Sequence, residues 1–134
     1  MIERYVEGWK DSILNTHHLS IASEVSTTGE INQPLGGRWR VAKIEVLVEP
    51  APSFCVSCEM EEPLTRQMER EGFLEHAVYG MIDILATAQL SPVLRLRIRF
   101  VGAAIHPVES TPVAFRLAGR DAARRILDQA KIVP

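Results

Sequence analysis

The sequence predicts an α+β fold, a two-layer sandwich in which helices pack on one face of a mainly antiparallel sheet. Apolar and polar residues alternate, as they do in strands, over the middle of the chain and again after Pro92. Residues 64–88 and 112–130 instead show the apolar spacing of helices. With 134 residues, 46% of them hydrophobic, the chain suits one compact domain with its own core.

The first segment, residues 2–14, is predicted to be a short amphipathic helix. Its apolar residues have the spacing of one helical face: Ile2, Tyr5, Val6, Trp9, Ile13 and Leu14. We favour a role as a lid on the core over a role as a partner-binding helix. The histidines that follow, His17 and His18, have no Cys or further His at ligand spacing, so we expect them in a solvated loop.

Strand patterns then cover the middle of the chain. Residues 19–27 alternate apolar with small or polar side chains and predict a strand, which we expect a loop at 28–37 to end. Residues 39–50 and 54–60 predict two more strands. We therefore expect these strands to form an antiparallel meander.

Two cysteines, Cys55 and Cys58, lie in the last of these strands. Residues three apart on a strand point to opposite faces, so the pair cannot close a metal site without a turn. A redox Cys-x-x-Cys is expected at the start of a helix. We therefore favour reduced structural cysteines and predict no metal site.

A broken helix and the clearest strand follow. Pro63 suits a helix start, and residues 64–88 predict a helix that breaks near Gly72. Its second part has a core face: Phe73, Ala77, Met81, Ile84 and Leu85. In the strand predicted at 93–100, the core-facing residues are Leu94, Leu96, Ile98 and Phe100.

The last predicted helix, residues 112–130, has a well-defined start. Thr111 is suited to the N-cap and Pro112 to the first helical position, where its missing N–H costs nothing. Glu109 and Ser110 place a negative group and a hydroxyl near the positive end of this helix. We expect a connecting loop at 102–110.

Charge and hydropathy limit which partners the protein can bind. The formal net charge is −2 and the isoelectric point about 6.1, so no overall field attracts nucleic acid or anionic lipid, and such binding requires a local patch. No apolar run reaches the length of a membrane span, and the first residues lack the pattern of a signal peptide. We expect a cytoplasmic protein without a membrane partner.

Motifs for catalysis and nucleotide binding are missing from the sequence. It contains no phosphate loop, dinucleotide fingerprint, nucleophile elbow or zinc-protease motif. His106, Glu109 and Ser110 superficially resemble a catalytic triad, but a local run ahead of a helix is better explained by capping. We therefore predict no enzyme activity, no cofactor and no nucleotide.

Arginines form two regular rows. Arg95, Arg97 and Arg99 repeat about every 6.6 Å along one strand face, and Arg116, Arg120 and Arg124 share a face of the last helix. A third basic set, Arg38, Arg40 and Lys43, follows Gly36-Gly37. These rows would either meet phosphates or be neutralised by acids of the fold, and charge alone slightly favours neutralisation. The candidate acids are Glu45, Glu59, Glu61 and Glu62.

The segment from Pro92 to about Ala123 resembles the closing strand, tip loop and helix of domain IV of bacterial elongation factor G. The matching loop and helix residues are His106, Val108, Glu109, Ser110, Thr111, Ala114, Phe115, Ala118 and Gly119. Upstream, Gly36-Gly37-Arg38 and a strand ending in Glu49-Pro50 are similar to the family's glycine loop and following strand. The segment around Gly80 sits where the family has its long helix. The resemblance covers about 100 of the 134 residues.

The resemblance implies the fold of the second domain of ribosomal protein S-five, which has a left-handed βαβ crossover. In the family, two tip loops of domain IV reach the decoding region of the small ribosomal subunit. The corresponding residues here are Gly36, Gly37 and Arg38 in one loop and His106, Glu109 and Ser110 in the other. The resemblance thus implies one domain over 1–134, with residues 1–30 as a divergent N-terminal extension.

The chain also departs from the family pattern. The family's Gly-Arg-Gly-Gln becomes Gly-Arg-Trp-Arg, with Trp39 at a glycine position, and Pro107 and Pro112 stiffen the second loop. Without a phosphate loop, the chain lacks the motor of a translocase.

Two hypotheses follow from these features. The leading one is a non-catalytic module that binds ribosomal or other structured RNA, with the arginine rows as phosphate contacts. The alternative is a protein-interaction or homo-oligomerisation module, which uses the apolar face of residues 2–14 and is favoured by the net acidity.

Overall fold

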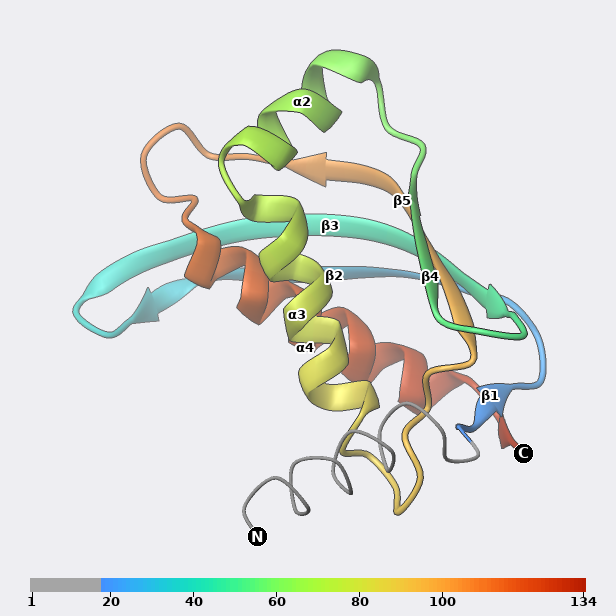
Figure 1. Cartoon of the computed structure of the whole chain (residues 1–134). Helices are drawn as coiled ribbons and strands as arrows, with labels where there is room; N and C mark the ends of the chain where they lie inside the picture. Colours follow the sequence, from blue (N-terminus) through green and yellow to red (C-terminus); the bar gives the residue numbers. More distant parts are fainter. Residues whose placement is uncertain (1–17) are drawn as a thin grey trace, which may run out of the picture.

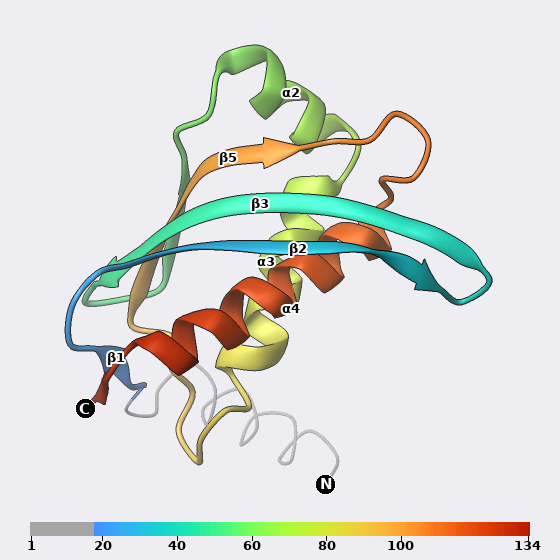
Figure 2. The same ribbon diagram turned by 180° about the vertical axis from the view of Figure 1, so that it is seen from behind.

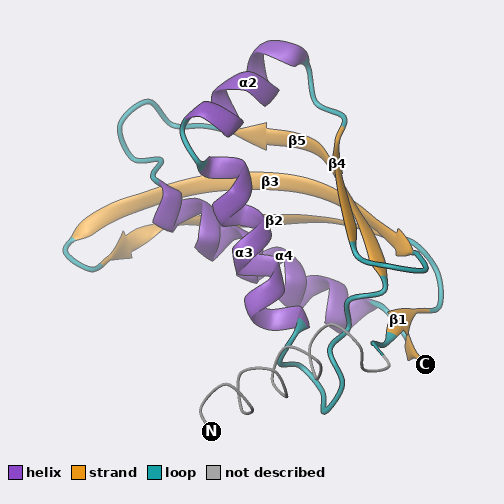
Figure 3. Ribbon diagram, in the orientation of Figure 1, coloured by secondary structure: helices purple, strands orange, loops and turns teal. Residues whose placement is uncertain are grey.

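The computed structural model describes residues 18–134, which form a four-stranded sheet with helices on one face (Figure 1, Figure 3). The elements in chain order are β1 (Ser20–Ile21), β2 (Val25–Leu35), β3 (Arg38–Pro50), β4 (Cys55–Cys58), α2 (Glu62–Arg70), α3 (Phe73–Leu85), β5 (Leu96–Ala104), α4 (Pro112–Gln129) and β6 (Ile132–Val133). The predicted α+β two-layer architecture is confirmed. The helix predicted at 2–14, and His17, lie outside the described residues.

The main sheet has the strand order β2-β3-β5-β4. β3 pairs antiparallel with both β2 and β5, whereas β4 pairs parallel with β5. The predicted meander is therefore wrong in its last strand. After β3 the chain passes the N-terminal end of β5, where the Ala51 N–H donates to the Arg95 carbonyl at 3.1 Å. It then forms β4 on the other side of β5 from β3. Parallel strands need a crossover, which α2 and α3 supply with the left hand that the family fold implies (Figure 1).

The hairpin of β2 and β3 is longer than predicted. The prediction of a loop at 28–37 is wrong, because β2 continues through residues 28–35. All of these residues pair with β3, and the last pair is Leu35 opposite Arg38. Only Gly36 and Gly37 form the turn, with φ of 66° and 81°. Two successive residues of positive φ make the tight turn that suits the twist of a hairpin.

β5 is displaced toward the C-terminus relative to the prediction. Val93 and Leu94 are buried, but the strand itself begins at Leu96 and continues to Ala104, into the expected loop. A bulge opposite Glu45 and Val46 inserts Val101 as the extra residue. The predicted alternation is confirmed, since Leu96, Ile98 and Phe100 are buried.

The helices follow the sequence pattern closely. The predicted break at Gly72 is confirmed, because this residue has a φ of 75° and separates α2 from α3. The predicted start of α4 is confirmed too, since Thr111 Oγ1 accepts the Ala114 N–H at 3.1 Å. α3 and α4 pack very closely at Gly80 and Gly119, where a Cβ would lie 2.0 and 2.1 Å from backbone oxygens of the facing helix.

The second face of the sheet is open among the described residues. Seen from behind, β3 and β5 have no helix across them on this side (Figure 2). Arg97 and Arg99 are on this face, opposite to the buried residues of β5. No helix in the described part of the chain has the length and hydropathy needed to cross a membrane.

Candidate nucleic-acid interface

The hairpin tip and the loop at 105–111 lie at the same end of the molecule (Figure 1). β3 pairs with β5 only from Lys43 onward, whereas it pairs with β2 from Arg38. Residues 38–42 and their partners 31–35 therefore continue past the end of β5 as a two-stranded ribbon. The two loops that the family resemblance singled out are thus neighbours in the fold.

The loop at 105–111 is held by its own side chains. His106 Nδ1 accepts the N–H groups of Val108 and Glu109 at 3.2 and 3.0 Å. Ser110 Oγ accepts the His106 N–H at 2.8 Å. These bonds fix a compact turn directly ahead of the N-cap. The helix-capping role predicted for Ser110 is wrong, because Thr111 caps α4 while the Ser110 hydroxyl bonds to His106 and Val41.

The same bonds argue against a triad. The Ser110 hydroxyl donates to the Val41 carbonyl at 2.7 Å, while His106 Nδ1 faces backbone N–H groups. A triad needs the imidazole to face the hydroxyl that it deprotonates. Here Ser110 positions the loop, and His106 Nε2 has no hydrogen-bond partner among residues 18–134.

β3 ties the loop to the hairpin. Besides accepting from Ser110, Val41 donates its N–H to the Glu109 carbonyl at 3.3 Å. Arg40 Nη1 donates to Thr111 Oγ1 at 3.3 Å, and Arg40 Nε donates to the Leu35 carbonyl at 3.3 Å. Arg40 therefore joins the hairpin end to the start of α4.

Two residues of the tip were not among the predicted contacts. Trp39 is 47% exposed, and its Nε1 donates to Asn32 Oδ1 at 2.8 Å. Arg40 was noted only as a member of a basic set. The run Gly37-Arg38-Trp39-Arg40 was the available signal, since arginines that alternate with an aromatic residue in sequence are typical of RNA-binding segments. The predicted contacts Gly36, Gly37 and Arg38 are all exposed at the turn.

The strand arginines have partners within the fold. Arg99 donates through Nε and Nη2 to the Glu59 carboxylate, at 2.5 and 2.9 Å. These hydrogen bonds lower the pKa of Glu59 and raise the pKa of Arg99. Arg97 lies 3.9 Å from a carboxylate oxygen of Glu49, and Arg95 Nε donates to the His18 carbonyl at 2.7 Å.

Two of the helical arginines share one carboxylate on α3. Arg116 contacts both oxygens of Asp83, at 2.8 and 2.9 Å, and Arg120 Nε contacts Oδ2 at 2.9 Å. The Arg116 hydrogen bonds lower the pKa of Asp83 most, burial opposes this, and Arg120 lowers the pKa further. The pKa of Arg116 is raised by the same contact. Arg124, in contrast, is exposed and has no carboxylate within ion-pair distance in the described chain.

Neutralisation by acids therefore occurs, although mostly through acids other than those expected. Of the candidate acids, Glu59 is the one that pairs with a row arginine, whereas Glu49 and Asp83 were not anticipated. Arg38 and Arg40 differ from the paired rows, because neither has a carboxylate within 4.0 Å among the described residues. The tip therefore keeps two positive charges without a carboxylate partner, and the half-buried Glu109 is the acid of the neighbouring loop.

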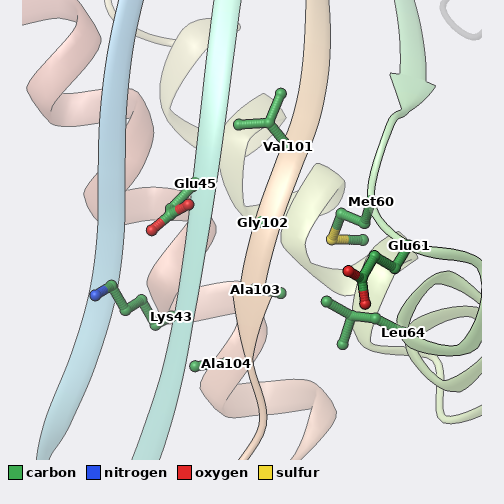
Figure 4. A pocket seen from close by; sticks show the side chains of 9 residues that line it. All are labelled: Lys43, Glu45, Met60, Glu61, Leu64, Val101, Gly102, Ala103 and Ala104. Atoms are coloured by element: carbon green, nitrogen blue, oxygen red, sulfur yellow. The ribbon is translucent and has the colours of Figure 1, made fainter.

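A pocket of about 310 Å³ lies elsewhere, between β3, β5 and the start of α2 (Figure 4). Its polar side chains are Lys43, Glu45 and Glu61, and Met60 and Leu64 close one side. Within residues 18–134 there is no cluster of three or more His, Cys, Asp or Glu that could hold a metal ion. Cys55 and Cys58 are free thiols in this part of the chain.

Comparison with known proteins gives consistent results. A family model described as elongation factor G, domain IV, matches residues 19–131. Elongation factor G 2 of Desulfotalea psychrophila is 31% identical over 131 residues, which cover 94% of this chain and 17% of that protein. Elongation factor G of Ehrlichia chaffeensis is 29% identical over 97 residues, covering 71% of this chain and 14% of the relative. The chain thus spans about a sixth of the length of these relatives.

One solved structure shows the shared fold. A crystal structure of a protein from Thermus thermophilus superposes with a TM-score of 0.74 over 86% of this chain and 17% of that one. The sequences are 17% identical. The family model begins at residue 19 and so includes β1 and the first part of β2, which belong to the segment 1–30 that was expected to diverge.

Proposed function

The chain belongs to the elongation factor G domain IV family, and from this premise we propose that it is a non-catalytic module that binds ribosomal or other structured RNA through its two tip loops. The family makes it a translation-factor-related module. The relatives are elongation factors of several times its length, so their partners are carried over here only as part of the proposal. A cytoplasmic location stays a prediction.

The observation that carries the proposal is the uncompensated charge of the joined loops. Arg38 and Arg40 lie at a projecting end of the molecule and have no carboxylate partner among the described residues, although the protein as a whole is mildly acidic. Phosphate contacts supply most of the affinity of nucleic-acid binding, and such a local patch provides them. The folded loop leaves His106 Nε2 without an internal partner, and Gly36 and Gly37 let a nucleic-acid backbone approach closely.

The predicted contacts differ in their roles. Arg38 and His106 would contact RNA directly, while the Ser110 side chain is engaged with Val41 and would position the loop. Glu109 holds Val41 through its carbonyl, and its carboxylate would repel phosphate, so we expect it to face a base or a ribose hydroxyl.

Phosphate contact by the arginine rows is a second part of the proposal. Arg97, Arg99, Arg116 and Arg120 would each have to exchange a carboxylate for a phosphate, which reduces the gain in free energy. Arg95 and Arg124 are free of this competition within the described chain. Arg97→Glu tests the strand row, since an unchanged RNA affinity would exclude it.

The main test is co-sedimentation with purified small ribosomal subunits at low and at physiological salt. Wild type is compared with Arg38→Ala and His106→Ala, and with Arg66→Ala as a control of equal charge change on α2. Arg66 is exposed and pairs only with Glu62 of the same helix among the described residues. We expect salt-sensitive binding that both tip variants weaken and the control does not.

Absence of binding at low salt would overturn the proposal. The alternative, a protein-interaction or oligomerisation module, would then lead. The apolar face that it would use, residues 2–14, lies outside the described residues.

A further inference from the structure

We propose that Trp39 is an aromatic platform that stacks on an unpaired base of the bound RNA, so that the module prefers RNA with an unpaired nucleotide to a continuous duplex. This inference rests on the proposed function, because it requires the hairpin tip to contact RNA. It concerns the position at which the chain departs from the family's glycine.

The indole ring is exposed and also held in place. Trp39 keeps 47% of its surface accessible, an unusual exposure for the largest apolar side chain. Its polar atom is already satisfied, because Nε1 donates to Asn32 Oδ1 at 2.8 Å across the hairpin. A ring whose N–H is bonded internally offers a ligand its face rather than a hydrogen bond.

Several independent contacts hold the hairpin that bears the Trp39 ring. Trp39 is paired opposite Pro34, one step from the glycine turn. The next two residues of β3, Arg40 and Val41, are bonded to Thr111 and to the 105–111 loop. The ring is therefore fixed before any ligand binds, which lowers the entropy lost on binding.

Charge and aromatic surface lie on opposite faces of the same short ribbon. Side chains alternate along a strand, so Trp39 faces away from both Arg38 and Arg40. Arg40 faces α4, as its bond to Thr111 shows. An RNA strand that passes around the tip would place a phosphate near Arg38 and a base against Trp39.

Stacking of this kind requires an unpaired base. Both faces of a base inside a duplex are covered by its neighbours, whereas a loop or bulge nucleotide can leave the stack and pack on an aromatic ring. Stacking also adds affinity that does not depend on salt, unlike the phosphate contacts of arginine.

The experiment uses Trp39→Phe and Trp39→Ala, with protein-free RNA from small subunits and intact small subunits as probes. We expect Trp39→Ala to weaken binding to both probes about tenfold, and Trp39→Phe to keep most of the affinity. The slope of log affinity against log salt should stay as in wild type for Trp39→Ala, whereas Arg38→Ala should reduce it by about 1.

A spectroscopic readout separates stacking from a structural role. The sequence holds two tryptophans, so a Trp9→Phe background leaves Trp39 as the single reporter. Its fluorescence should be quenched by an RNA stem with one bulged nucleotide, and much less by the fully paired stem of equal length. Asn32→Ala, which frees the indole without removing it, should weaken binding less than Trp39→Ala.

The outcomes are distinguishable. If wild type binds and Trp39→Ala binds equally well, or if the bulged and paired stems quench alike, the stacking proposal is wrong and the proposed function stands. If Trp39→Ala loses affinity for intact subunits but not for protein-free RNA, Trp39 contacts a protein and the stacking proposal is also overturned. If wild type binds neither probe at low salt, both proposals fail together.

Discussion

Replacing Gly80 or Gly119 by alanine should destabilise the fold, although helix propensity predicts the opposite. Alanine in a helix interior is more favourable than glycine by about 1 kcal/mol. At Gly80, however, the added Cβ would lie 2.0 Å from the Arg116 carbonyl oxygen and 3.0 Å from the Arg120 nitrogen. At Gly119 it would lie 2.1 Å from the Ala77 oxygen.

The expected loss of stability depends on the atoms that the added Cβ would contact. These atoms belong to helix backbone and cannot rotate away, so α3 and α4 must separate, which also loosens the stacked Phe73 and Phe115 rings at 4.6 Å. Overpacking typically costs about 1–3 kcal/mol, and a backbone clash belongs near the upper end. After subtraction of the propensity gain, the net loss is about 2 kcal/mol, or roughly 8 °C in Tm.

The assay is urea and thermal unfolding of both single variants and the double variant, followed by circular dichroism. Because one separation of the helices relieves both clashes, the double variant should lose less than the sum of the two single variants. Gly37→Ala is the control for backbone strain alone. Gly37 has a φ of +81°, and a Cβ added there would meet no atom within 4 Å. A single variant as stable as wild type would refute the close-packing argument.

Three further predictions concern charge, the tip and the cap. Asp83→Asn should lower the free energy of unfolding by about 1 kcal/mol at pH 7. The pKa of Asp83 is lowered from 3.8 in the folded state, so the difference between variant and wild type should be present above pH 3.8 and disappear as the pH falls through the folded-state pKa. Urea unfolding at several pH values measures this difference. Ser110→Ala removes two hydrogen bonds and should lower the free energy of unfolding by about 1–2 kcal/mol. The His106 amide should then exchange its hydrogen faster, as measured by NMR. Unchanged exchange at His106 would contradict the role of Ser110 in holding the loop. Thr111→Ala should cost about 1 kcal/mol through loss of the N-cap, measurable by urea unfolding, whereas Thr111→Ser should restore most of it.

Much of the fold could be read from local patterns. The start of α4 at Thr111-Pro112, the helix break at Gly72 and the buried alternation of β5 depend on residues close in sequence. The hairpin was misjudged because Gly29, Asn32 and Pro34 are typical of loops, yet pairing with β3 holds them in a strand.

The sequence indicated which two loops to examine, but not how they are joined. The resemblance singled out the His106 loop and the glycine turn, whereas their union through Arg40 and Val41 depends on bonds between residues about 70 positions apart. Whether an arginine is neutralised also depended on distant partners, as Asp83 shows for Arg116.

By itself, then, the sequence determined where the helices begin and break and which residues of β5 face the core, since capping, turn formation and side-chain alternation act over a few residues. The tertiary structure decided that β4 joins the far edge of the sheet, that Asp83 neutralises two arginines, and that Arg38 and Arg40 keep their charge at the tip. These outcomes depend on which distant groups come within a few ångströms of one another. Strand order and helix packing set those distances, and no local pattern encodes them.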